Sequence, residues 1–184
     1  MIPRHAKLVF KGLLFEIYHW QQKMFDGSFE TFEAVKRKHR TVVIIPTVKN
    51  KIVVLRQKQP NTKWFYCTPS GRMDVPKESP KACALRELLE ETGMKPESIK
   101  LWKKIIRNGK IQHTIYFFIA RNCQVVTGQK LDAGEKIKVE YFSFDKFLKI
   151  TDRPIRHIEE SLWDMFRARL NKKYRGNFKK VIFG

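Results

Sequence analysis

The chain has 184 residues, 42% hydrophobic and 12% aromatic, so we expect one buried core and a single domain spanning residues 1–184. No apolar run is long enough to span a bilayer, and the N-terminal stretch mixes charges into its apolar residues. We therefore predict no membrane span, no signal peptide and a cytoplasmic location. The net charge of +20 favours phosphorylated ligands, either nucleotides or RNA. Three widely spaced cysteines without a C-x-x-C pair indicate reduced, structural thiols.

Residues 1–40 hold two segments rich in aromatic and branched side chains, 7–22 and 28–37, separated by Asp26-Gly27. An Asp-Gly pair between such segments is typical of a tight turn, so we predict a long antiparallel hairpin. Its aromatic residues, Trp20 among them, are candidates for stacking on a nucleotide base, but strand aromatics more often serve core or dimer packing. The hairpin is therefore also a candidate dimerisation element.

The next region begins with two nearly continuous apolar segments, 41–48 and 51–57, on either side of a short turn. Continuous apolar character predicts strands that are buried on both faces. A third short strand at 63–69 leads into Gly71, and Asn108-Gly109 predicts a tight turn between two later strands. Both faces of such a sheet must be covered by other layers of the protein.

From Pro80 onward the apolar residues recur at helical spacing. Ser79 is suited to cap the start of this helix, with proline in its first turn, and Gly93 is suited to end it. Glu87 and Glu91 then lie one turn apart on the same face.

The same helix face also carries Glu90, so that three carboxylates crowd the C-terminal end of the helix. Like charges one turn apart repel each other, and the helix dipole disfavours anions at this end. A divalent cation would offset that cost, since oxygen ligands suit Mg²⁺ or Mn²⁺. The sequence therefore predicts a metal site on this helix.

Residues 71–94 resemble the Nudix box, G-x5-E-x7-R-E-U-x-E-E-x-G-U, where U is aliphatic. Gly71, Glu78 and the run from Arg86 to Met94 supply its fixed positions, with six residues instead of five between Gly71 and Glu78. More loosely, the rest of the chain resembles the subgroup that cleaves ADP-ribose and other nucleoside diphosphate sugars. The resemblance implies an α/β class Nudix fold, an α/β/α sandwich with a mixed β-sheet, an N-terminal antiparallel hairpin and a C-terminal helix. Residues 41–150 would form the catalytic core.

The resemblance also implies a metal site. Glu87, Glu90 and Glu91 would hold two or three Mg²⁺ ions, or Mn²⁺, with Glu87 and Glu91 as the first choices for direct ligation. The backbone carbonyl of Ser70, just before the box glycine, would complete the site.

Two further residues of this chain match functional positions of the family. Arg86 would orient a glutamate of the site by charge-assisted hydrogen bonding, whereas Glu78 would be structural. Glu135, in a loop after the box, would act as base or extra ligand, with Asp132 and Glu140 close by as competing acids.

The implied reaction is hydrolysis of the pyrophosphate of a nucleoside diphosphate linked to a sugar or other group, giving a nucleoside monophosphate and a phosphorylated product. Arg37 and Arg56 are candidates for binding substrate phosphates, although either can be a solvated surface charge. The substrate would be a nucleotide-type small molecule and the protein a homodimer. One alternative is a pyrophosphohydrolase of RNA 5′ ends or dinucleoside polyphosphates, and another is a non-enzymatic nucleotide or RNA sensor.

Residues 151–184 are predicted to form a C-terminal helix followed by a basic tail. The helix is indicated by one apolar stripe, comprising Ile155, Ile158, Leu162, Met165, Phe166 and Leu170. The tail, residues 172–184, is expected to dock as a terminal strand or ordered tail, with RNA binding as the alternative.

Overall fold

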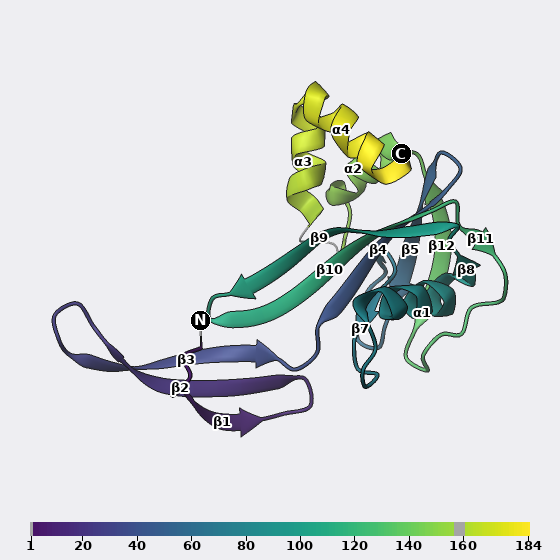
Figure 1. Ribbon diagram of the computed structural model, residues 1–184. Coiled ribbons are helices and arrows are strands. Elements are labelled where there is room, and N and C mark those ends of the chain that lie inside the picture. The colour runs from purple at the N-terminus through teal and green to yellow at the C-terminus, as the bar shows by residue number, and fades with distance from the viewer. Residues whose placement is uncertain (1, 157–160) are drawn as a thin grey trace.

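A computed structural model describes residues 2–156 and 161–184 and contains a large mixed sheet with helices on both sides (Figure 1). The strands are β1 (Lys7–Lys11), β2 (Phe15–Lys23), β3 (Phe29–Arg37), β4 (Thr41–Val48), β5 (Lys51–Lys58), β6 (Phe65–Cys67), β7 (Ser70–Arg72), β8 (Met94–Lys95), β9 (Ser98–Asn108), β10 (Ile111–Arg121), β11 (Gln124–Val125) and β12 (Lys136–Phe142). The helices are α1 (Pro80–Thr92), α2 (Phe144–Leu148), the 3₁₀ helix η1 (Lys149–Asp152), α3 (Leu162–Leu170) and α4 (Lys172–Phe183).

The sheet follows the order β1-β2-β3-β10-β4-β5-β12, and β6, β7 and β9 pair with β5, β4 and β10 respectively. Strand β10 pairs in parallel with both β3 and β4, whereas the other pairs in this sheet are antiparallel. This order brings the ends of β3, β4 and β5 close to β7 and α1. The candidate site lies among these elements.

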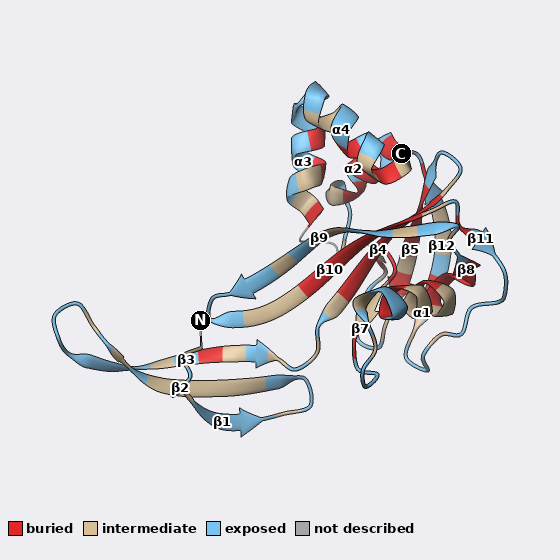
Figure 2. Cartoon of the chain, viewed as in Figure 1, coloured by how far each residue is buried: buried red, intermediate tan, exposed pale blue. Residues whose placement is uncertain are grey.

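Separate clusters of buried residues cover the two faces of the central strands, because successive strand residues point to opposite sides. On one face Val43 and Phe117 pack with Phe178 of α4, and on the other Ile44 packs with Leu88 of α1. Figure 2 shows the buried residues concentrated in these central strands and the inner sides of the helices. The predicted α/β/α sandwich with a mixed sheet is therefore confirmed.

The N-terminal region forms the predicted antiparallel pairing, with β2 and β3 in register from Phe15↔Arg37 to Lys23↔Phe29. The segment 7–22 is not one strand, however, because the chain turns back at Gly12. The Gly12 amide donates to the Phe15 carbonyl at 2.8 Å, and β1 then pairs with β2. The region is thus a three-stranded ribbon rather than a simple hairpin.

Helix α1 begins and ends where its sequence predicts. The Ser79 side chain accepts a hydrogen bond from the Ala82 amide at 3.1 Å, and Gly93 ends the helix with φ of 70°. A side chain at Gly93 would also meet the Thr127 carbonyl oxygen at 2.1 Å. Only glycine therefore meets both demands, the left-handed backbone and the close loop contact.

The predicted C-terminal helix is present as α3 and the tail is ordered and docked, but two details of the prediction were wrong. Ile155 lies in a β-bridge with Tyr66 before the helix, and Leu170 is 88% exposed, so the expected apolar stripe is only partly buried. Ile158 lies outside the described residues. The tail is helix α4 rather than a strand, since the Asn171 side chain caps the Tyr174 amide at 2.8 Å and Phe178 is buried.

All three cysteines are free and buried, as expected for structural thiols. No helix within the described ranges is both long and apolar enough to cross a membrane.

Candidate active site

A cavity of about 510 Å³ opens where β3, β4, β5, β7, α1 and the loop before β12 meet. It collects most of the residues that the sequence singled out. Those lining it are Arg37, Ser70, Arg86, Glu87, Glu90, Glu91 and Glu135.

Helix α1 packs directly on β7 through two of its glutamates. A Cβ atom built on Gly71 would lie 1.9 Å from the Glu87 carboxyl carbon, so the carboxylate occupies the space that any larger residue would fill. One turn later, a Glu91 oxygen accepts a hydrogen bond from the Ser70 amide at 3.0 Å. The box glycine is therefore required by the position of Glu87.

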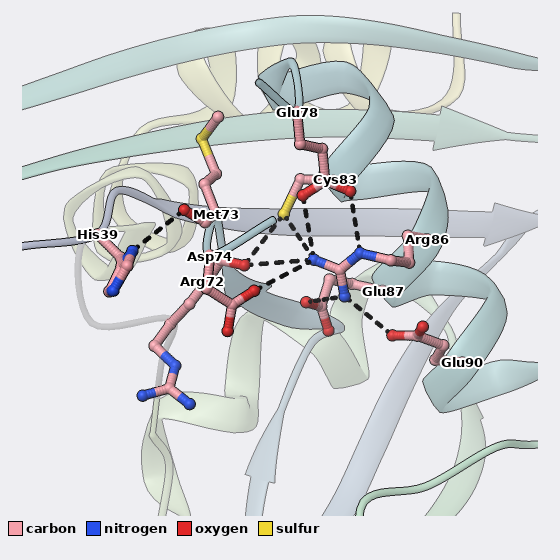
Figure 3. A network of polar contacts seen from close by, with 9 residues as sticks. All are labelled: His39, Arg72, Met73, Asp74, Glu78, Cys83, Arg86, Glu87 and Glu90. Atoms are coloured by element: carbon pink, nitrogen blue, oxygen red, sulfur yellow. Dashed lines mark hydrogen bonds and ion pairs between the residues drawn. The ribbon is translucent and has the colours of Figure 1, made fainter. Parts of the chain in front are cut away.

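Arg86 is the centre of a charged network beside these carboxylates (Figure 3). Its guanidinium donates to Glu78 at 2.9 Å, to Glu87 at 2.8 Å and to Glu90 at 3.0 Å. It also reaches the Arg72 carbonyl at 3.3 Å. Arg86 thus fixes Glu87 and Glu90 in orientation, and Glu78 completes the network without lining the cavity.

Burial dominates the electrostatics of the glutamates. It raises the pKa of Glu87 to about 7, although Arg86 opposes the rise. Glu91, only 6% exposed, has a pKa well above its usual value because of burial and the nearby charge of Glu87. By contrast, the hydrogen bond from Arg86 lowers the pKa of Glu78. Burial therefore raises the pKa of both residues expected to ligate metal directly.

Glu135 reaches the same cavity from the loop before β12. The side chains of Gln57 and Gln59 donate to its Oε1 atom at 3.0 and 3.4 Å, and burial raises its pKa. The loop is tied to α1, since the Lys130 amide donates to the Glu90 carbonyl at 2.8 Å. The two glutamines were not predicted as site residues, although the sequence Gln57-Lys-Gln59 at the end of a buried strand was a possible signal.

The structure does not bring Trp20 or Arg56 into this cavity. Trp20 packs against Phe32 in the N-terminal ribbon, with ring centroids 5.8 Å apart. The Arg56 guanidinium lies over the ring of Trp64, 5.3 Å from its centroid. Neither residue lines the cavity, so neither position supports the expected substrate contact within one chain.

Within residues 2–156 and 161–184, no three carboxylate, imidazole or thiol groups form a ready metal cage. The contacts explain this, because Arg86 pairs with Glu87 and Glu90 while Glu91 faces the Ser70 amide. Mg²⁺ commonly binds through one or two carboxylates, with water and substrate phosphates as its other ligands. Glu87 and Glu91, which both line the open cavity, fit that mode of binding.

An α/β/α sandwich whose cavity combines buried carboxylates with arginines defines a class of protein suited to phosphorylated ligands and divalent cations. The chain belongs to the NUDIX family, because the sequence model of the NUDIX domain matches residues 37–161. This confirms the resemblance drawn from residues 71–94.

Two curated relatives are similar over most of their lengths. An "ADP-ribose pyrophosphatase" of Bacillus subtilis (strain 168) is 25% identical over 147 residues, covering 78% of this chain and 79% of the relative. A "Methanol dehydrogenase activator" of Bacillus methanolicus is 31% identical over 144 residues, covering 77% of each. A crystal structure described as an ADP compounds hydrolase superposes with a TM-score of 0.74 and 16% identity, covering 94% of both chains. That structural likeness supports the fold.

Proposed function

We propose that the protein is a Mg²⁺-dependent hydrolase of the pyrophosphate in a nucleoside diphosphate linked to a sugar or similar group, with ADP-ribose as the first candidate. The observation that carries this proposal is a pair of carboxylates, half-buried Glu87 and buried Glu91, packed against β7 at the cavity. Family membership and the similarity to an ADP-ribose pyrophosphatase support it.

Each residue has a distinct role in the proposed reaction. Glu87 and Glu91, with Glu90 and the Ser70 carbonyl, would hold the Mg²⁺ ions, two or three in number, and Mn²⁺ is the alternative metal. The metal supplies charge neutralisation on the pyrophosphate oxygens and a more acidic bound water. Arg86 keeps Glu87 and Glu90 oriented through its hydrogen bonds.

Glu135 is the proposed proton acceptor. Its raised pKa makes it a better base than an exposed carboxylate, because a general base works best when its pKa lies nearer the working pH. Gln57 and Gln59 hold its carboxylate in the cavity by donating to one oxygen, which leaves the other available. Glu135 can then take a proton from the attacking water.

A hydrolysis panel tests the function. The purified protein would be incubated with Mg²⁺ and ADP-ribose, other nucleoside diphosphate sugars, dinucleoside polyphosphates or triphosphorylated RNA, and the products identified by chromatography. The proposal predicts a nucleoside monophosphate and a sugar phosphate from the first two groups. Turnover of RNA ends alone would replace it with the RNA alternative, and nucleotide binding without turnover would favour a sensor.

Metal binding should depend on pH in a direction set by Glu87. A carboxyl whose folded pKa is raised to about 7 contributes stability that is fully present below its unfolded pKa and is lost as the pH rises through the folded pKa. The metal-free protein should therefore lose stability as the pH rises from about 4.5, the ordinary pKa of a glutamate, to about 7. Mg²⁺ binds the ionised form, so its stabilising effect should grow over the same interval.

Thermal unfolding in EDTA and in Mg²⁺, measured across this pH range, checks the expectation. The increase in Tm on adding Mg²⁺ should be larger on the alkaline side of neutrality than on the acidic side. An increase that is independent of pH would contradict the assignment of Glu87 as a ligand that must lose its proton.

We also propose a cytoplasmic homodimer that associates through the N-terminal ribbon. Strands β1 to β3 and their turns expose large apolar side chains, including Phe10 at 56%, Leu13 at 89% and Phe29 at 63%. Burying such a patch is a common basis of subunit association. Sedimentation equilibrium should show a dimer that Phe10→Glu weakens and Leu170→Glu, an exposed site on α3, does not. A monomeric wild type would refute the proposal.

A further inference from the structure

One end of the cavity is lined by two arginines from separate strands. Arg37 is the last residue of β3, and Arg72 is the last residue of β7. Strand β7 pairs with β4 so that Arg72 lies opposite Thr41, the first residue of β4 and also part of the cavity lining. The sheet thus gathers two cationic side chains and one hydroxyl at the same end.

Neither arginine has an acidic partner within the described parts of the chain. Arg86, in contrast, pairs with Glu78, Glu87 and Glu90. Figure 3 shows the Arg72 guanidinium turned away from the Arg86 network, although its backbone carbonyl belongs to that network. No acidic side chain of the described residues therefore pairs with either of these two charges, although Asp74 and four glutamates line the same cavity.

The surroundings strengthen the demand for an anion. Arg37 is half-buried, and its pKa is lowered first by burial and then by the charge of Arg72. His113 lies behind them, with Nε2 2.9 Å from the Thr41 hydroxyl. Burial and the charge of Arg37 lower the pKa of His113 to about 4, so this imidazole is neutral at pH 7. The two guanidinium charges repel each other, and a negative group bound between them would relieve that repulsion.

A phosphate group has the charge and shape to do so. It carries nearly two negative charges at neutral pH and three acceptor oxygens, which the planar guanidinium of arginine binds in a fork-like manner. The Thr41 hydroxyl offers an additional hydrogen bond. The acid closest to Arg72 along the chain, Asp74, pairs with Arg86 instead, at 3.9 Å.

We propose that Arg37 and Arg72 form a subsite for a phosphate group that the substrate carries in addition to the two phosphates of the scissile pyrophosphate. This inference rests on the proposed function, in which the pyrophosphate lies at the glutamates. The substrate class is then a nucleoside diphosphate derivative with an additional terminal phosphate, either on a sugar hydroxyl or at the end of a longer phosphate chain.

Binding of inorganic phosphate tests the subsite without any turnover. Titration calorimetry would be performed on the metal-free protein in EDTA at constant ionic strength. No metal ion at the glutamates can then attract the anion. Arg72→Gln should weaken phosphate binding by at least about tenfold, as loss of a charged hydrogen-bonding partner implies. Lys138→Gln removes one charge from an exposed position on β12 outside the cavity and should bind phosphate as the wild type does. Equal binding by Arg72→Gln and wild type would overturn the proposal.

The kcat/KM of a substrate with an additional phosphate, divided by the kcat/KM of ADP-ribose, then distinguishes this subsite from a simple pyrophosphate contact. ADP-ribose 2′-phosphate and ATP represent the two sources of an additional phosphate, and ADP-ribose is the reference substrate. The wild type should prefer at least one of the two over ADP-ribose, and Arg72→Gln should reduce that preference by at least about tenfold. An equal loss on all substrates would overturn the subsite and leave the hydrolase function standing. If no substrate is turned over but phosphate binding depends on Arg72, the anion site stands and the hydrolase proposal fails.

Discussion

Replacing Gly71 with alanine is expected to reduce hydrolysis by about 10- to 100-fold, the usual range for changes that displace a metal ligand from its position. The added Cβ atom would lie 1.9 Å from the Glu87 carboxyl carbon and 2.0 Å from one of its oxygens. Because these atoms are at the end of a flexible side chain, Glu87 can move and the fold can survive. The substitution should therefore lower the activity much more than it lowers the stability of the fold.

The measurement is kcat/KM with Mg²⁺ alongside the Tm of the metal-free protein. Gly109→Ala is the matched control, since a Cβ atom there meets nothing within 4 Å. It should leave both quantities close to wild type. Gly71→Ala with wild-type kcat/KM would show that the position of Glu87 does not matter to the reaction.

The Glu91→Gln protein is expected to lose at least about 100-fold in kcat/KM, comparable to removing a group that stabilises charge in a transition state. The amide keeps an oxygen that can accept the hydrogen bond from the Ser70 amide. It removes a buried charge whose pKa is already raised by burial. In EDTA at alkaline pH the variant should be as stable as the wild type or more so, which a purely structural role for Glu91 would not produce.

The Tm in Mg²⁺ completes this test. Mg²⁺ should raise the Tm of the wild type and have a smaller effect on Glu91→Gln. Glu97→Gln is the control, because Glu97 is an exposed residue that contacts Asn122 at 2.8 Å, away from the cavity. Near-normal turnover by Glu91→Gln would exclude Glu91 as a required metal ligand.

The site helix was predictable because its signals are local. Ser79, Gly93 and the spacing of the leucines define α1 without reference to the rest of the chain, and the glutamates follow from helical geometry. The same signals existed in the tail, where Asn171 can cap a helix and Tyr174 and Phe178 are one turn apart. Many basic residues and Gly176 lie between the apolar residues of this segment and make their helical spacing hard to recognise. Helix α4 was therefore not predicted from the sequence.

Contacts between distant segments could not be predicted in this way. The approach of Arg37 to Arg72 depends on parallel pairing of β10 with both β3 and β4, and the sequence gives no local sign of that order. The contact of Gln57 with Glu135 similarly depends on β12 pairing with β5. Candidate residues chosen by chemistry alone therefore included Arg56, whose side chain lies over Trp64 instead of in the cavity.

The central claim is that Glu87 and Glu91 of α1 hold a divalent cation. The most direct measurement is anomalous diffraction from crystals of the protein grown with Mn²⁺, which can take the place of Mg²⁺ among oxygen ligands. The account predicts anomalous peaks beside the carboxylates of Glu87 and Glu91 and near the Ser70 carbonyl, and none there in Glu91→Gln crystals. A wild-type map with no peak in this cavity, or with peaks unchanged in Glu91→Gln, would contradict it.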